Sequence, residues 1–166
     1  HSRYISLTGV QTCALPILVI DCVKGVEEQT EKLMEVCRMR NTPVIVFVNK
    51  MDRDGKDPFD LLEELENKLN IGVHPMSWPI NGGKDFKGVY LLHNQSLNLF
   101  ESSKTKMADD VVKINGLSDP QIDTILNAKD ASKLRDDVEL IDGVYGELSQ
   151  SDYLSAKTAP VFFRSE

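Results

Sequence analysis

An unbroken apolar run at residues 44–48, VIVFV, constrains the fold of this chain more than any other feature. It is rich in β-branched residues, which favour strands, and it offers no polar position that could face water. A strand of a one-sided antiparallel sheet would alternate apolar with polar residues, whereas a central parallel strand is covered on both faces. The run therefore predicts a central parallel strand with covering helices, which is an α/β fold.

The segment before this run predicts a strand followed by a helix. Residues 18–22, LVIDC, form a shorter apolar run that ends in a turn containing Gly25. From residue 26 to residue 40, apolar side chains recur on one helical face, with acidic residues early and basic residues late. That charge order suits the helix dipole. A strand, a helix and a second strand make a βαβ unit, whose crossover is expected to be right-handed.

The rest of the chain predicts more helices and a small antiparallel insertion. Asp57 and Pro58 are typical of a helix start, and apolar residues at helical spacing continue to residue 69. Residues 72–117 hold strand-like segments separated by turn residues, so we expect the insertion there. Further elements are expected as helices at about 120–126 and 131–141 and as a third buried parallel strand at 160–163.

Both ends of the chain look foreign to this fold. Residues 8–17, TGVQTCALPI, lack helical or strand periodicity and resemble the translation of a common DNA-sequencing adapter. Residues 14–17 can be encoded as GCT CTT CCG ATC and residues 164–166 as AGA TCG GAA, which are reverse-complement overlaps of one oligonucleotide. We therefore expect residues 1–17 and 164–166 to be foreign adapter-like segments, and residues 18–163 to be an internal fragment.

The composition excludes several functional classes. The chain has 19 basic and 26 acidic residues and a pI near 5.0, so autonomous nucleic-acid binding is not expected. No apolar run approaches the roughly 20 residues that span a bilayer, so no membrane partner is expected. Cys13, Cys22 and Cys37 show no C-x-x-C spacing and cannot all pair. Reduced thiols and a cytoplasmic location follow.

The tetrapeptide Asn49-Lys50-Met51-Asp52 directly follows the central strand and carries the candidate chemistry. Ligands of open α/β sheets bind outside the carboxyl ends of the strands, which is where this N-K-x-D pattern stands. The Asp52 carboxylate can accept hydrogen bonds from N1–H and the N2 amino group of guanine, whereas adenine has no donors there. Asn49 can tie the loop and contact N7, and the aliphatic stem of Lys50 can cover the base. The alternative interpretation is a polar strand-to-helix turn of no special function.

Longer blocks of sequence resemble the bacterial class II peptide chain release factor, release factor three, over nearly all of residues 18–163. The blocks are VIDCVKGVEEQTEKLMEVCRMRNTPVIVFVNKMDRDGKDPFDLLEELENKLNI, SWPINGGKDFKGVYLL, KLRDDVELIDGV and APVFF. Elongation factor G is a near neighbour that shares N-K-M-D and a similar insertion. The resemblance implies the last three parallel strands of a P-loop-type GTPase domain.

The resemblance also implies a function for the parent protein. Such a protein would be an enzyme of the cytoplasm that binds GTP or GDP with Mg²⁺ and hydrolyses GTP on the ribosome. It would promote departure of the class I release factor during translation termination. Asn49, Lys50 and Asp52 would be its nucleotide-binding residues here, with no catalytic or metal-binding residue in this chain.

Departures from the family pattern limit what this chain can do alone. It lacks a G-x-x-x-x-G-K-[ST] phosphate loop, and the family's D-x-x-G element and the histidine expected just after it would lie upstream of residue 18, so we expect the chain to be catalytically inactive. Ser165 stands where the family has a guanine-contacting loop, but it lies in the segment set aside as foreign, so it is assigned no role. Two alternatives stay open for the function: an elongation factor G-like translocation GTPase, and a non-enzymatic α/β interaction module.

Overall fold

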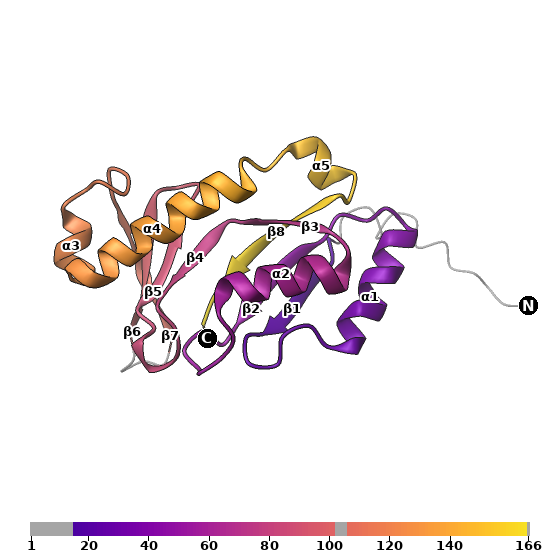
Figure 1. Ribbon diagram of the computed structural model, residues 1–166, viewed down its shortest axis with the longest axis horizontal. Helices are drawn as coiled ribbons and strands as arrows, with labels where there is room; N and C mark the ends of the chain where they lie inside the picture. Colours follow the sequence, from indigo (N-terminus) through magenta and orange to yellow (C-terminus); the bar gives the residue numbers. More distant parts are fainter. Residues whose placement is uncertain (1–14, 102–105, 166) are drawn as a thin grey trace, which may run out of the picture.

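The computed structural model describes residues 15–101 and 106–165, which form two four-stranded sheets flanked by helices (Figure 1). The first sheet is parallel, with strand order β1-β2-β8-β3. Its strands are β1 (Ile17–Asp21), β2 (Ile45–Asn49), β8 (Thr158–Phe163) and β3 (Gly72–Pro75). The predicted α/β class is confirmed, and β2 is a central strand as its apolar run indicates.

Along the chain, helix α1 (Glu28–Met39) connects β1 to β2, and helix α2 (Pro58–Leu69) connects β2 to β3. The two helices pack on each other. Buried side chains alternate along the strands, with Leu18 and Ile20 on β1 and Val46 and Val48 on β2. Four leucines of α2 are buried in the same core: Leu61, Leu62, Leu65 and Leu69. The intervening residue of β1, Val19, is 62% exposed, so the sheet is covered unequally on its two faces.

The parallel sheet has four strands, which corrects the expectation of three. Residues 72–75 do not belong to the expected antiparallel insertion, because β3 pairs in parallel with β8, from Gly72 opposite Thr158 to Pro75 opposite Val161. The strand is short and does not show the long apolar run of a central strand, because it lies at an edge of the sheet. Its partner is far away along the chain, so local sequence pattern does not reveal the pairing.

The antiparallel sheet begins at Ser77 and has the strand order β4-β5-β6-β7. Its strands are β4 (Ser77–Ile80), β5 (Gly88–Leu91), β6 (Ser96–Glu101) and β7 (Lys106–Lys113). A short 3₁₀ helix, η1 (Gly83–Asp85), joins β4 to β5. The antiparallel character of the insertion is therefore confirmed from β4 onward.

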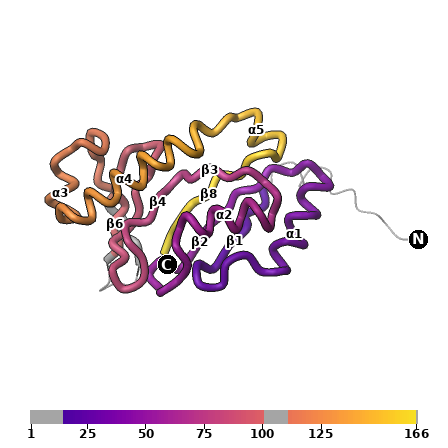
Figure 2. The backbone as a smooth tube through the Cα atoms, viewed as in Figure 1, coloured from indigo at the N-terminus to yellow at the C-terminus, as the bar shows by residue number. Residues whose placement is uncertain are grey.

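Three helices follow the insertion, and the longest lies along β3 and β4 (Figure 2). They are α3 (Gln121–Leu126), α4 (Ala128–Tyr145) and α5 (Gln150–Leu154). Helix α4 extends beyond the expected 131–141 at both ends, and at its start Asn127 caps the helix by accepting a hydrogen bond from the backbone N–H of Asp130. Helix α5 was not expected, and its five residues are too short to show a clear apolar period.

Trp78 and Ser77 join the two sheets. Trp78 is 1% exposed, and its ring packs against Phe59 of α2 and Phe163 of β8. Its indole N–H donates to Asp137 of α4 at 3.0 Å. The Ser77 hydroxyl accepts from the backbone N–H of Phe163 and donates to its carbonyl. The insertion is therefore bound to the parallel sheet through the last residue of β8.

Candidate functional site

The N-K-M-D segment lies at the carboxyl end of β2, between the ends of β1 and β8. Asn49 is in register with Asp21 of β1, and its carbonyl accepts from the backbone N–H of Cys22. On the other side, the N–H of Arg164 donates to the carbonyl of Val48. Three strand ends thus meet at this loop, which is the position at which open α/β sheets bind ligands.

Lys50 has an unusual backbone conformation that three contacts hold in place. Its φ of 65° lies in the left-handed region, which a non-glycine residue adopts only at a cost. Its N–H donates to Asn49 Oδ1 at 2.8 Å, and its carbonyl accepts from the Cys22 thiol at 2.9 Å. The N–H of the next residue, Met51, donates to the carbonyl of Arg164. The loop is therefore fixed on both sides of Lys50.

Cys22 supports this loop from within the core. Its side chain is 1% exposed. Burial, together with the nearby negative charges of Asp21 and Asp52, raises the pKa of the Cys22 thiol to about 11. The thiol therefore keeps its proton near neutral pH, which lets it donate to the Lys50 carbonyl. Cys22 is a free cysteine within the described residues.

The side chain of Lys50 is paired with a carboxylate of the neighbouring strand. Its Nζ lies 2.6 Å from Oδ2 of Asp21, while Oδ1 of Asp21 accepts from the backbone N–H of Val23 at 2.8 Å. The hydrogen bond from Lys50 and those from the following backbone N–H groups lower the pKa of Asp21. Asp21 is therefore charged and fixed at neutral pH.

Asp52 is half-buried, and one of its oxygens, Oδ1, accepts from the hydroxyl of Ser165. Ser165 is fully buried just beyond the end of β8. From sequence, Ser165 was assigned no role. The signal that could have found it is its position, because it follows a parallel strand as the other residues of this group do. The serine orients the carboxylate of Asp52, the last residue of the N-K-x-D pattern.

The structure thus brings Asn49, Lys50 and Asp52 together with Asp21 and Ser165. Met51 is buried in the core. A cavity of about 400 Å³ lies beside the loop, lined by residues that include Met51, Lys56, Trp78 and Lys133, but not by the three predicted site residues. The predicted residues therefore form a surface at the strand ends that is distinct from this cavity.

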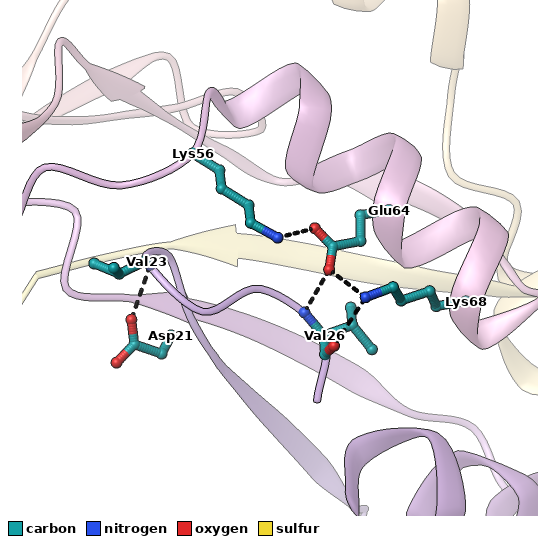
Figure 3. A network of polar contacts seen from close by, with 6 residues as sticks. All are labelled: Asp21, Val23, Val26, Lys56, Glu64 and Lys68. Atoms are coloured by element: carbon teal, nitrogen blue, oxygen red, sulfur yellow. Dashed lines mark hydrogen bonds and ion pairs between the residues drawn. The ribbon is translucent and has the colours of Figure 1, made fainter. Parts of the chain in front are cut away.

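The segment after the motif is held to the turn after β1 by a network of charges (Figure 3). Glu64 of α2 accepts from the backbone N–H of Val26 at 2.9 Å and from the ammonium groups of Lys56 at 2.6 Å and Lys68 at 2.9 Å. Burial alone would raise the pKa of Glu64, but these hydrogen bonds lower it to about 2. The network ties the segment that follows the motif to the beginning of α1.

Neither a metal cluster nor a membrane-spanning helix occurs in the described part of the chain. Within residues 15–101 and 106–165, no three His, Cys, Asp or Glu side chains converge in a way that could hold a metal ion. In the same residues, no helix has both the length and the apolar character needed to cross a bilayer.

Comparison with known proteins agrees with this fold. The family model of the elongation factor Tu GTP-binding domain matches residues 2–161. A crystal structure of a protein from Thermus thermophilus is similar to this chain with a TM-score of 0.55 and 19% sequence identity. The similarity covers 91% of this chain and 24% of that protein, so the chain spans about a quarter of the length of that relative. With most of its residues matched by the family model, the chain belongs to the family of elongation factor Tu GTP-binding domains, which are the nucleotide-binding domains of translational GTPases.

Proposed function

We propose that Asn49, Lys50 and Asp52 recognise the guanine base of GTP or GDP. The observation that carries this proposal is the position of Asp52, whose half-buried side chain lies just after β2 at the carboxyl end of the parallel sheet. A carboxylate at this position offers acceptors to the N1–H and N2 amino group of guanine. Adenine would leave the carboxylate without donors, which is costly at a half-buried site.

The other two residues have complementary roles in this proposal. The amide of Asn49 holds the left-handed Lys50 backbone through its Oδ1, which leaves its amino group to face the base edge. The methylene stem of Lys50 covers the face of the base. This division assigns base recognition to the described residues and leaves the phosphates to other parts of the family domain.

Nucleotide hydrolysis is proposed for the parent protein and not for this chain. The family binds nucleotide together with Mg²⁺, but the described residues bring no set of ligands together for a metal ion, so no step is assigned to magnesium here. The sequence has no G-x-x-x-x-G-K-[ST] loop, whose backbone N–H groups hold phosphates in such proteins. We therefore infer that the 166-residue chain binds guanine weakly and does not hydrolyse GTP.

We further propose that the parent acts on the ribosome in translation termination and promotes release of the class I release factor. The support is the resemblance of the blocks SWPINGGKDFKGVYLL and DPFDLL to release factor three. An elongation factor G-like role in translocation fits the family and the fold equally well. With the full-length parent, the two roles are separated by measuring class I release factor dissociation from terminated ribosomes and tRNA translocation in parallel.

The guanine assignment is tested by nuclear magnetic resonance titration of the chain with GDP, ADP and xanthosine diphosphate. We expect GDP to shift the amide signals of residues 49–52 more strongly than ADP. Asp52→Asn presents a donor to the donors of guanine, so GDP should bind about tenfold more weakly or worse, while xanthosine diphosphate should gain relative to it.

The matched control for this experiment is Asp54→Asn, which neutralises an exposed carboxylate of the same loop. This variant should bind GDP as the unmodified chain does. Equal responses to GDP and ADP in the unmodified chain, or unchanged base preference in Asp52→Asn, would contradict the role given to Asp52 and favour a non-enzymatic interaction module.

A further inference from the structure

The Asp21 carboxylate is anchored before any ligand arrives. It ends β1 opposite Asn49, and its Oδ1 accepts from the N–H of Val23 at 2.8 Å. The carbonyl of Asp21 also accepts from the N–H of Gly25, which closes the turn on itself. The side chain of Asp21 is only 17% exposed. Its negative charge is therefore held in a fixed position beside the loop that carries the motif.

Lys50 depends on Asp21 for the position of its side-chain tip. Its backbone is fixed by Asn49, Cys22 and the contact of Met51 with Arg164, so the remaining freedom lies in the torsions of the side chain. A free lysine side chain samples many rotamers, and this conformational entropy would be lost when a base packs on its stem. The 2.6 Å pair with Asp21 restricts these torsions in advance.

We propose that Asp21 is a positioning residue for base binding, which holds the stem of Lys50 in place through the ammonium group at its end. This inference rests on the proposed guanine site and adds a residue outside the N-K-x-D pattern. Asp21 touches Lys50 and not the base, so it acts by preorganisation: the ordering of the lysine stem precedes binding instead of opposing it.

The first measurement uses the nucleotide-free 166-residue chain and follows the Lys50 side chain by ¹⁵N relaxation and by exchange of its ammonium protons. We expect the ammonium group to be ordered in the unmodified chain and mobile in Asp21→Asn. The asparagine keeps an oxygen for the N–H of Val23, so the turn should stay intact. An equally ordered Lys50 in Asp21→Asn would overturn the proposal without any reference to nucleotide.

The second measurement is the dissociation constant for GDP, with the ring-current shift of the Lys50 methylene protons as its spectroscopic signature. Asp21→Asn should weaken GDP binding about threefold to tenfold, because the free energy needed to order one rotamer-rich side chain corresponds to about that change in affinity. It should also reduce the upfield shift of the Lys50 methylene protons. Lys50→Met keeps a stem without an ammonium group and should show a similar loss. In the Lys50→Met background, Asp21→Asn should have no further effect.

The matched control is Asp123→Asn, which removes the carboxylate of a different ion pair. This pair, between Asp123 and Arg135, lies away from the motif. It should leave GDP binding unchanged. If Asp21→Asn weakens binding equally with and without the Lys50 ammonium group, Asp21 has a purely structural role and the proposal fails. Lys50→Met tests the proposal independently, whether or not Asp21→Asn folds. If Lys50→Met binds GDP as tightly as the unmodified chain does, the proposal fails. Absence of guanine preference in the unmodified chain instead overturns the site itself, and this role with it.

Discussion

A single carboxylate, Glu64, satisfies three donors from different parts of the chain. It joins a backbone N–H before α1, a lysine of the loop after the motif and a lysine one turn along its own helix. Hydrogen bonds to charged groups contribute more than neutral ones, and the backbone N–H of Val26 is buried. The contribution of Glu64 to stability therefore exceeds that of an ordinary surface ion pair.

Replacement of Glu64 by Gln should lower the free energy of unfolding by about 1 to 2 kcal/mol at neutral pH. Because the folded-state pKa of Glu64, about 2, lies below its ordinary value of 4.5, its stabilisation is fully present above pH 4.5 and is lost as pH falls toward 2. Urea denaturation at several pH values should show the two proteins converging on acidification.

Glu63→Gln is the control, because Glu63 is the exposed neighbour of Glu64 on α2. It should change the unfolding free energy by no more than a few tenths of a kcal/mol. A constant difference between Glu64→Gln and the unmodified chain from about pH 7 down to about pH 2 would contradict the ionic account of the network.

At the scale of elements, the accuracy of sequence reasoning depended on how local the determining interactions are. The bounds of α2 were predicted because capping and apolar spacing are properties of adjacent residues. The central strand β2 was predicted because its apolar run is unbroken. Strand β3 was misassigned because its place in the parallel sheet is set by pairing with β8, which no local pattern encodes.

The start of α2 is stabilised by a side-chain cap. Asp57 accepts from the N–H groups of Phe59 at 2.9 Å and Asp60 at 3.4 Å, and Pro58 occupies the first turn. Asp57→Ala should therefore lower the unfolding free energy by about 1 kcal/mol, whereas Asp57→Ser, which can still cap, should retain most of it. Chemical denaturation measures both, and equal stability of the two variants would contradict the capping role.

The whole molecule is organised around the end of β8, which contacts both the insertion and the candidate site. The three predicted site residues could be found because they form a recognisable pattern at one strand end. Asp21 could not, because it comes from another strand and approaches the motif only when the sheet is assembled, and Ser165 was recognisable only by its position after a parallel strand. A site built across strand ends is therefore only partly visible in a linear sequence.

The two hydrogen bonds between Ser77 and Phe163 connect the antiparallel sheet to the parallel sheet. Ser77→Ala would leave the buried N–H of Phe163 without its partner, so the unfolding free energy should fall by about 1 to 3 kcal/mol. The single tryptophan, Trp78, lies at the junction of the sheets, and its fluorescence during urea unfolding reports the loss.

Ser96→Ala is the matched control, since Ser96 is equally buried but its hydroxyl has no hydrogen-bond partner among the described residues. That variant should be as stable as the unmodified chain or more so. Equal losses from both substitutions would mean that the Ser77 contact does not stabilise the junction of the sheets.

Lys50 has a further consequence for any attempt to redesign this chain. Among the described residues, four of the six other left-handed non-glycine positions hold asparagine, which tolerates that conformation: Asn41, Asn70, Asn81 and Asn127; Gln95 and Ala156 occupy the remaining two. Lysine tolerates it poorly, at a cost of about 1 to 2 kcal/mol that glycine would avoid. A design procedure that rewards stability alone would therefore select glycine at this position. The redesigned protein would be more stable, but it would lack the side chain that is proposed to cover the base.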